Sequence, residues 1–217
     1  MPYARFCDAA RLHRCFTALG IEDLAQPLKL NLGCGSDILP GWVNVDRHAG
    51  LGVDRVLDLE SLPWPWADST VEEVRLKHVL EHLGRETETF LGVIKELWRV
   101  CSDGAKVAIT VPHPRHDAFL NDPTHVRPVT DGMLRVFDQS ANLDDQRRGF
   151  SNTPLCLITG VDFRVESVQY MLEPKWLERH QRGEISHDDL SHAAVHYNNV
   201  IRETSILWRA VKPPGRP

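Results

Sequence analysis

The chain has 217 residues, of which 42% are hydrophobic and 25% are charged, and its formal net charge is −5. This length suits one domain with a sizeable core, and the composition is typical of a globular protein. No apolar run approaches the roughly 18 residues of a membrane span, and the N-terminus lacks the continuous apolar core of a secretory signal. We therefore expect no membrane partner and a cytoplasmic location. The negative charge disfavours nucleic acid as a partner.

The five cysteines are odd in number, widely spaced and without a Cys-X-X-Cys pair. Neither a disulfide framework nor a zinc knuckle is supported by this pattern.

We interpret residues 1–217 as a single domain in three parts. Residues 1–27 form an N-terminal helical segment, in which an amphipathic helix is closed by Gly20. In residues 28–112, apolar runs alternate with helix-like segments, which is typical of a parallel sheet covered on both faces. The predicted strands of this half are residues 28–33, 42–46, 55–59, 72–78 and 106–112, and the clearest helix is 86–101.

Residues 113–217 form the second half, which we expect to lie on the substrate side. It begins with an insertion after the fifth strand and contains a short helix near 131–137. Two further strands, 163–171 and 206–211, bring the total to seven. Between them lies a polar, helix-prone excursion, residues 173–199, which is too long for a hairpin turn. We expect it to serve as a lid or as the contact of a homodimer. The predicted fold class is α/β, doubly wound, with a mostly parallel seven-stranded sheet.

The stretch LNLGCGSDILPGWVNVD, residues 30–46, contains the first functional signal. Gly33 and Gly35 allow a backbone turn into which a ligand can come close. Asp46 ends the next strand, where a carboxylate can accept hydrogen bonds from ribose hydroxyls. A dinucleotide site would have a third glycine, where this sequence has Ile38, and a later acidic residue. A nucleoside is therefore the expected ligand.

Four motifs in order, LNLGCG, LDLESLPWPWAD, LKHVLEHL and ELWRVCSDGAKVAITVP, make residues 28–112 resemble a class I S-adenosylmethionine-dependent methyltransferase of the small-molecule type. The resemblance implies a Rossmann-like methyltransferase fold with S-adenosylmethionine as the cofactor. Asn31 stands where that family commonly has an acidic residue. By resemblance, the cofactor-binding residues are Gly33 and Gly35 for the methionine part, Asp46 for the ribose, Asp58 and Leu59 for the adenine, and His78 facing the cleft.

Structural roles compete with some of these assignments. Asp58 could cap the following turn, because aspartate often does so. His82 lies four residues after His78 and shares its face if a helix begins there, and a structural role is the more frequent one. The tryptophans of LPWPW could wall the adenine or pack in the core.

Residues 113–128, HPRHDAFLNDPTHVRP, place histidines, aspartates and arginines directly after the fifth strand. We interpret this loop as the roof of the acceptor pocket, with three alternatives. The favoured one makes His125 a general base with Asp122 as its partner, and His113 the alternative base. In the second, histidine and carboxylate side chains hold a divalent metal that binds two acceptor oxygens, although the spacing fits no named metal motif. In the third, the polar residues cap turns and pair with each other.

Two arginines and a histidine pair add lesser signals. Arg115 and Arg127 could grip an anionic group of the substrate. His192 and His196 have helical spacing but no third ligand, which is typical of a solvated helix face.

The sequence thus predicts methyl transfer to an oxygen or nitrogen of a small-molecule or glycan-like acceptor. The alternative is a non-catalytic module that binds S-adenosylmethionine or S-adenosylhomocysteine as a sensor or assembly partner. A nicotinamide oxidoreductase is disfavoured by the missing third glycine and the early Asp46.

Overall fold

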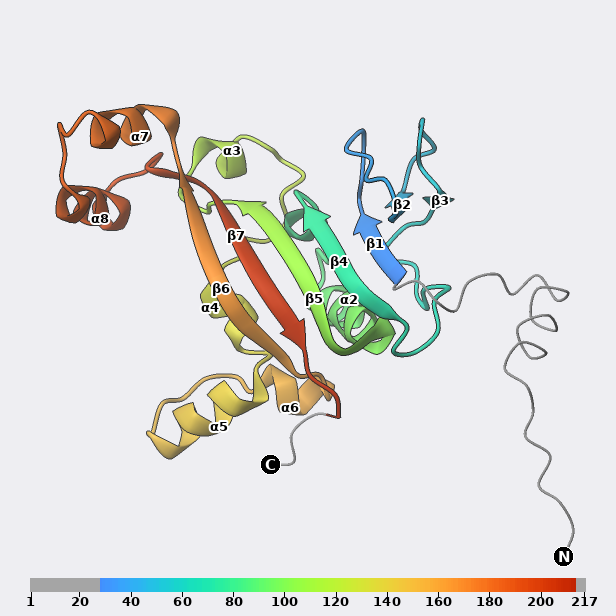
Figure 1. Ribbon diagram of the computed structural model, residues 1–217. Helices are drawn as coiled ribbons and strands as arrows, with labels where there is room; N and C mark the ends of the chain where they lie inside the picture. Colours follow the sequence, from blue (N-terminus) through green and yellow to red (C-terminus); the bar gives the residue numbers. More distant parts are fainter. Residues whose placement is uncertain (1–27, 214–217) are drawn as a thin grey trace, which may run out of the picture.

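The structure, a computed structural model, describes residues 28–213 and is built on one seven-stranded sheet with the strand order β3-β2-β1-β4-β5-β7-β6 (Figure 1). The first five strands run parallel, and β7 is antiparallel to both β5 and β6. The predicted N-terminal helix lies outside the described residues. The strands are β1 (Leu28–Leu32), β2 (Val43–Asp46), β3 (Arg55–Val56), β4 (Val71–Lys77), β5 (Cys101–Pro112), β6 (Phe163–Leu172) and β7 (Ile201–Ala210).

Most of the described helical segments lie after β5, in the second half of the chain. None of the helices between residues 28 and 213 is long and apolar enough to cross a membrane. Their bounds are η1 (Leu80–His82), α2 (Thr87–Val100), α3 (Asp117–Leu120), α4 (Asp131–Arg135), α5 (Gln139–Arg147), α6 (Leu155–Thr159), α7 (Pro174–Gln181) and α8 (His187–His196).

One face of the sheet carries the hydrophobic core. Alternating residues of β5 and β7, such as Val107 and Trp208, point into it, and α2 and α4 cover it from behind the sheet in Figure 1. From α2, Phe90, Ile94 and Leu97 enter the core at helical spacing, as the sequence predicted. The core therefore lies between α2, α4 and one face of the central strands.

The opposite face is polar. Cross-strand neighbours on it include the ion pair of Lys29 with Glu73, at 2.7 Å, and the hydroxyls of Thr110 and Ser205, 3.1 Å apart. Ala108, in the middle of the sheet, is exposed. The connections among the first four strands contain no helix, and Figure 1 shows no described helix over this face. Within residues 28–213, the expected helical cover is thus present on one face only.

The strand predictions were right in number and order, but several bounds differ. The third strand pairs only over Arg55–Val56, whereas 55–59 was predicted. The fifth and last strands are longer than expected because β5 follows α2 without a loop and β7 pairs along its whole length with β6. The short helices α3, α5 and α6 were not predicted, since they are too short for a clear periodicity.

The predicted excursion is helical and consists of α7 and α8. Leu190, Ala193 and Val200 form a small hydrophobic cluster with Trp176 and Ile185, separate from the main core. Figure 1 shows both helices beyond the end of the β6–β7 hairpin, near α3. The excursion thus lies at the edge of the sheet where parallel strands β4 and β5 end.

Candidate functional site

A cavity of about 470 Å³ opens where β1, β2 and β4 end, a volume that suits a cofactor or drug-sized ligand. Ligands of doubly wound sheets bind at this edge. Five of the six residues expected to bind the cofactor line the cavity. The sixth, Gly35, lies beside it, two residues after Gly33. Its lining residues are Gly33, Asp46, Arg47, His48, Leu57, Asp58, Leu59, Glu60, His78, Val79, His82, Leu83 and Arg85.

The glycine turn after β1 forms one wall. Gly33 has φ +65°, and a Cβ added to it would meet a Val79 methyl group at 2.4 Å. Gly35 has φ +51°, and its N–H donates to Asp46 Oδ2 at 2.9 Å. The two glycines therefore bring the main chain against β4 and tie the turn to the end of β2.

The link between β1 and β2 contains no helix, and two buried asparagines fix its conformation by hydrogen bonds. The Asn31 amide donates to the Asp37 carbonyl at 2.7 Å and to Asn44 Oδ1 at 2.9 Å. Arg75 donates to Asn31 Oδ1 at 3.2 Å and to the Asp37 carboxylate at 2.6 Å. The Arg75 guanidinium holds the pKa of Asp37 below its ordinary value. Asn31, where the resembled family has an acidic residue, thus closes the loop structurally.

Asp46 and Asp58 both line the cavity while accepting main-chain hydrogen bonds. Asp46 Oδ1 accepts from the His48 N–H at 2.9 Å, and Asp58 Oδ1 accepts from the Glu60 N–H at 3.0 Å. The turn-capping role considered for Asp58 is therefore present. A carboxylate has about four acceptor positions, so both side chains keep capacity for ligand hydroxyl or amino groups.

His78, at the end of β4, has φ +54°, which is uncommon for a residue other than glycine. Its N–H donates to the Thr110 carbonyl at 2.8 Å. Its Nδ1 lies 3.5 Å from Glu81 Oε1 and its Nε2 lies 3.5 Å from Glu203 Oε1. The Glu81 carboxylate raises the pKa of His78 above its ordinary value, although partial burial opposes the shift. His78 does not begin a helix, because η1 starts at Leu80.

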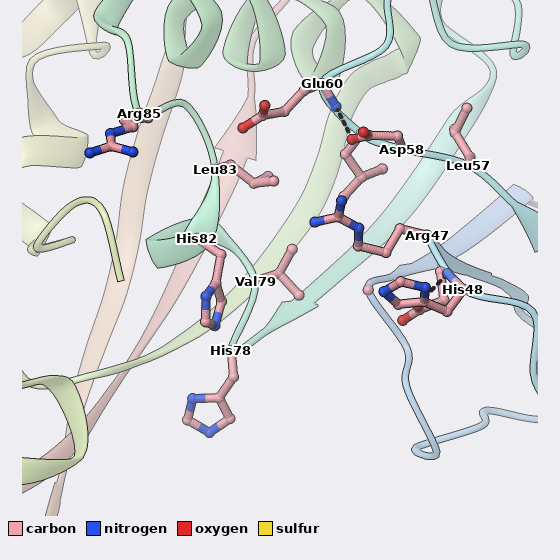
Figure 2. Close-up of a pocket in the computed structure, with 13 residues that line it drawn as sticks. Arg47, His48, Leu57, Asp58, Glu60, His78, Val79, His82, Leu83 and Arg85 are labelled. Atoms are coloured by element: carbon pink, nitrogen blue, oxygen red, sulfur yellow. Dashed lines mark hydrogen bonds between the residues drawn. The ribbon is translucent and has the colours of Figure 1, made fainter. Parts of the chain in front are cut away.

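The remaining walls contain residues that the sequence analysis missed. Figure 2 shows Arg47 and His48 on one side of the cavity, with His78, Val79 and His82 across from them. Glu60 closes a third side, where its Oε1 accepts from the Gly84 N–H at 2.6 Å. The signal for Arg47, His48 and Glu60 was their position one or two residues after a predicted cofactor-binding aspartate.

The loop after β5 brings His125 to η1. The His82 and His125 rings meet edge to face with centroids 4.6 Å apart, and Phe119 stacks on the His125 ring at 5.2 Å. His125 Nε2 lies 3.7 Å from Asp122 Oδ2, so the predicted pair is close but longer than a hydrogen bond. Thr124 hydrogen bonds hold the pKa of Asp122 below its ordinary value.

His113 and His116 occupy turns and do not line the cavity. Nδ1 of His113 accepts from the Arg115 N–H at 3.2 Å, and Nδ1 of His116 accepts from the Ala118 N–H at 2.9 Å. Burial lowers the pKa of His113. The turn-capping interpretation of the loop thus describes these two histidines, while His125 lies with His82 instead.

The two arginines of the loop bind main-chain carbonyls. Arg115 donates to the carbonyls of Ala194 and Val195 at the end of α8. Arg127 donates to the Gly84 carbonyl at 2.7 Å and lies over the Phe90 ring at 4.4 Å. These contacts fasten the loop to the excursion and to α2.

The tryptophans of LPWPW pack in the core rather than around the cavity. Trp64 is buried, and its indole N–H donates to the Leu59 carbonyl at 3.0 Å. Trp66 packs edge to face on Trp64 with centroids 6.1 Å apart. Through the Leu59 carbonyl, Trp64 positions the main chain at one side of the cavity.

The architecture matches solved structures over nearly the whole chain. A SAM-dependent methyltransferase from Archaeoglobus fulgidus aligns with a TM-score of 0.56 and 15% sequence identity, covering 92% of this chain and 93% of that one. This chain has the class I methyltransferase fold. The mostly parallel seven-stranded sheet expected from the resemblance is thereby confirmed. Structural similarity at 15% sequence identity shows the fold alone, and the reaction depends on the residues of the site.

A SAM-dependent methyltransferase from Methanosarcina mazei aligns with a TM-score of 0.47 and 14% identity, covering 89% of this chain and 97% of that one. Its TM-score is too low to add to the comparison. No protein-family model and no curated protein matches the sequence.

Proposed function

We propose that the protein is an S-adenosylmethionine-dependent methyltransferase that acts on an oxygen or nitrogen of a small-molecule or glycan-like acceptor. The cavity at the ends of β1, β2 and β4 carries this proposal, because Gly33, Asp46, Asp58 and His78 come from different segments and line one space. The methyltransferase fold places its ligand at this edge.

Each cofactor part has a candidate partner. The turn at Gly33 and Gly35 offers main-chain contact to the methionine part, and Asp46 accepts hydrogen bonds from the ribose hydroxyls. Asp58 accepts from the adenine amino group, beside the main chain of Leu59. His78 stands between this space and the loop after β5.

S-adenosylmethionine supplies a sulfonium-bound methyl group that is already activated for transfer. The turn at Gly33 and Gly35, with Asp46 and Asp58, would hold this group. An acceptor lone pair would take up its methyl carbon with S-adenosylhomocysteine as the leaving group, and the proton of the acceptor would pass to a histidine of the acceptor side or to water. The protein contributes mainly by holding the acceptor in line with the methyl group, because alignment of this kind can supply about 7–11 kcal/mol of the barrier reduction. The Val126 N–H donates to the Glu81 carbonyl at 2.9 Å, which ties the acceptor loop to η1. A loop fixed in this way supports such alignment.

Binding of S-adenosylhomocysteine to an Asp46→Ala variant tests the cofactor assignment. Loss of hydrogen bonds to a charged group costs about 1.5–3 kcal/mol, so we expect affinity to fall roughly 10- to 100-fold by calorimetry. Glu72→Ala is the matched control, because Glu72 is exposed at the opposite end of β4. Absence of binding to the wild type, or unchanged affinity in a folded Asp46→Ala protein, would contradict the proposal.

Activity is tested by incubating the protein with labelled methyl donor and an extract of its host. We expect label to appear in a small-molecule or glycan fraction. Tight cofactor binding without transfer to any acceptor would favour the sensor alternative.

A further inference from the structure

Glu81, in η1, is the most unusual side chain near the cavity. It is 0% exposed, and neither carboxylate oxygen has a hydrogen-bond partner among the described residues. Its nearest charged neighbour is His78 Nδ1, 3.5 Å from Oε1. Burying a carboxylate costs free energy unless it is paired, hydrogen-bonded or coordinated to a metal. Among the described residues, Glu81 has a single charged neighbour, His78, and no hydrogen-bond partner on either oxygen.

The hydrogen bonds of His125 indicate which of its ring nitrogens is available as a ligand. Its Nδ1 lies 2.8 Å from the Phe119 carbonyl. A carbonyl only accepts, so Nδ1 carries a proton, and in the neutral form of the ring Nε2 is the nitrogen with the lone pair. Hydrogen bonding of Nδ1–H to a main-chain carbonyl is the usual arrangement of a metal-binding histidine.

His82 is oriented in the same way through Thr124. The Thr124 hydroxyl donates to Asp122 Oδ1 at 2.6 Å, so its oxygen accepts from His82 Nδ1, 3.0 Å away. In the neutral form of the ring, Nε2 of His82 is then the nitrogen with the lone pair. Asp122, predicted to orient His125, instead orients His82 through the threonine.

One ligand atom from each of Glu81, His82 and His125 lies within 4.8 Å of those of the other two. Nitrogen and oxygen ligands lie about 2.0–2.2 Å from an ion, so the three side chains would move closer together to hold one. We propose that Glu81, His82 and His125 bind a divalent first-row transition-metal ion. Two imidazoles and a carboxylate on one side of the ion leave its other positions open.

The simpler alternative is that Glu81 only pairs with His78. That pairing would occupy one carboxylate oxygen and would leave the other oxygen and the two Nε2 lone pairs without a role. A bound metal ion would give a role to the second Glu81 oxygen and to both Nε2 atoms, and it would make His125 a ligand rather than a base.

The proposal deepens the proposed function and rests on it for the role of the ion. His82 lines the cofactor cavity, so the ion would face the acceptor side. Its open positions suit an acceptor with two neighbouring oxygens, such as a vicinal diol, and binding would lower the pKa of the hydroxyl to be methylated. We therefore infer that the acceptor class is one that can chelate.

The test uses the full chain, stripped with a chelator and titrated with Co²⁺ while visible absorption is recorded. We expect ligand-field bands that saturate at one ion per chain and disappear when Zn²⁺ is added. His82→Ala, Glu81→Gln and His125→Ala should each weaken Co²⁺ binding by about 100-fold or more. Thr124→Val, which removes the hydroxyl that links His82 to Asp122, should weaken it about 10- to 100-fold. Circular dichroism checks that each variant is folded.

The double variant His192→Ala/His196→Ala is the control, because these exposed rings on α8 lie with centroids 4.2 Å apart and offer an adventitious histidine site. Its binding should equal that of the wild type. Absence of saturable bands in the wild type, or bands lost only in the control, would overturn the proposal.

Calorimetry with S-adenosylhomocysteine on the same metal-free protein separates the two proposals. Nucleoside binding without Co²⁺ binding would overturn the metal site and leave the proposed function standing. Co²⁺ binding at these three residues without nucleoside binding would support the metal site and contradict the proposed function.

Discussion

At the scale of single residues, the cavity depends on positions where the main chain comes close to a neighbouring element. Gly33 lies against Val79, which follows β4, and both residues line the cavity. His78, with its positive φ, is the residue between β4 and that contact. The conformations of two adjacent turns therefore determine where a cofactor can lie.

Gly33→Ala tests this contact. A left-handed conformation costs an ordinary residue about 1–2 kcal/mol, and forcing a methyl group into a packed site costs about 1–3 kcal/mol more. We expect thermal unfolding to show a loss of roughly 2–5 kcal/mol and calorimetry to show weaker S-adenosylhomocysteine binding. Gly183→Ala is the control, since its φ is +71° with nothing within 4 Å of an added Cβ. Equal losses in the two variants would show that the contact with Val79 is unimportant.

At the scale of elements, a partly buried ion pair on α2, Glu96 with Arg99, fastens this helix to the segment between β3 and β4. Glu96 Oε1 accepts from the Trp64 N–H at 2.6 Å, and Arg99 donates to both Glu96 oxygens, at 2.6 and 2.9 Å. Arg99 also donates to the carbonyls of Trp64 and Trp66. The segment that supports Asp58 and Leu59 is thus held by a helix that does not itself line the cavity.

This pair should make the protein sensitive to acid. The Arg99 guanidinium holds the pKa of Glu96 below the ordinary value of 4.5. Since the folded pKa is the lower one, unfolding takes up a proton, and the stabilisation is present above about pH 4.5 and is lost as the pH falls through the folded pKa. We expect denaturant unfolding to show this loss and Glu96→Gln to flatten it. Glu88→Gln, at an exposed position of the same helix, should leave it unchanged.

At the scale of the whole molecule, the described chain is a sheet with one covered face and with its loops gathered at one edge. The loop after β5 contacts α8 through Arg115, and His116 Nε2 lies 3.1 Å from Glu173 Oε2 at the start of α7. The excursion therefore lies against the predicted acceptor loop. This contact supports the lid interpretation, while the homodimer contact remains a prediction.

Replacement of residues 174–199 by a short turn tests whether the excursion is separate from the core. Leu172 already pairs with Ile201, so a hairpin can close there. We expect one cooperative unfolding transition to remain and the affinity for S-adenosylhomocysteine to stay within about threefold, because the excursion has its own hydrophobic cluster. Loss of the whole transition would show that it belongs to the core.

The sequence by itself determined the sheet, its strand number and the cofactor edge. Apolar runs that end in glycine or aspartate indicate where strands stop, and parallel strands bring those ends to one edge. This local pattern selects Gly33 and Asp46 as candidates for one site, and the resemblance adds Asp58 and His78. The same reasoning predicted α2 from its apolar spacing, since that pattern is local to the chain.

Only the tertiary structure decided which polar residues of the acceptor side meet. His82 and His125 are separated by 43 residues, and the sequence could not show that the loop after β5 folds back onto η1. Nor could it show that Glu81 is buried without a hydrogen-bond partner among residues 28–213, because burial depends on what packs around the side chain. Hydrogen bonds that the His82 and His125 rings donate to Thr124 and to the Phe119 carbonyl set which nitrogen of each neutral ring is free. A role as base, metal ligand or turn cap depends on that long-range geometry.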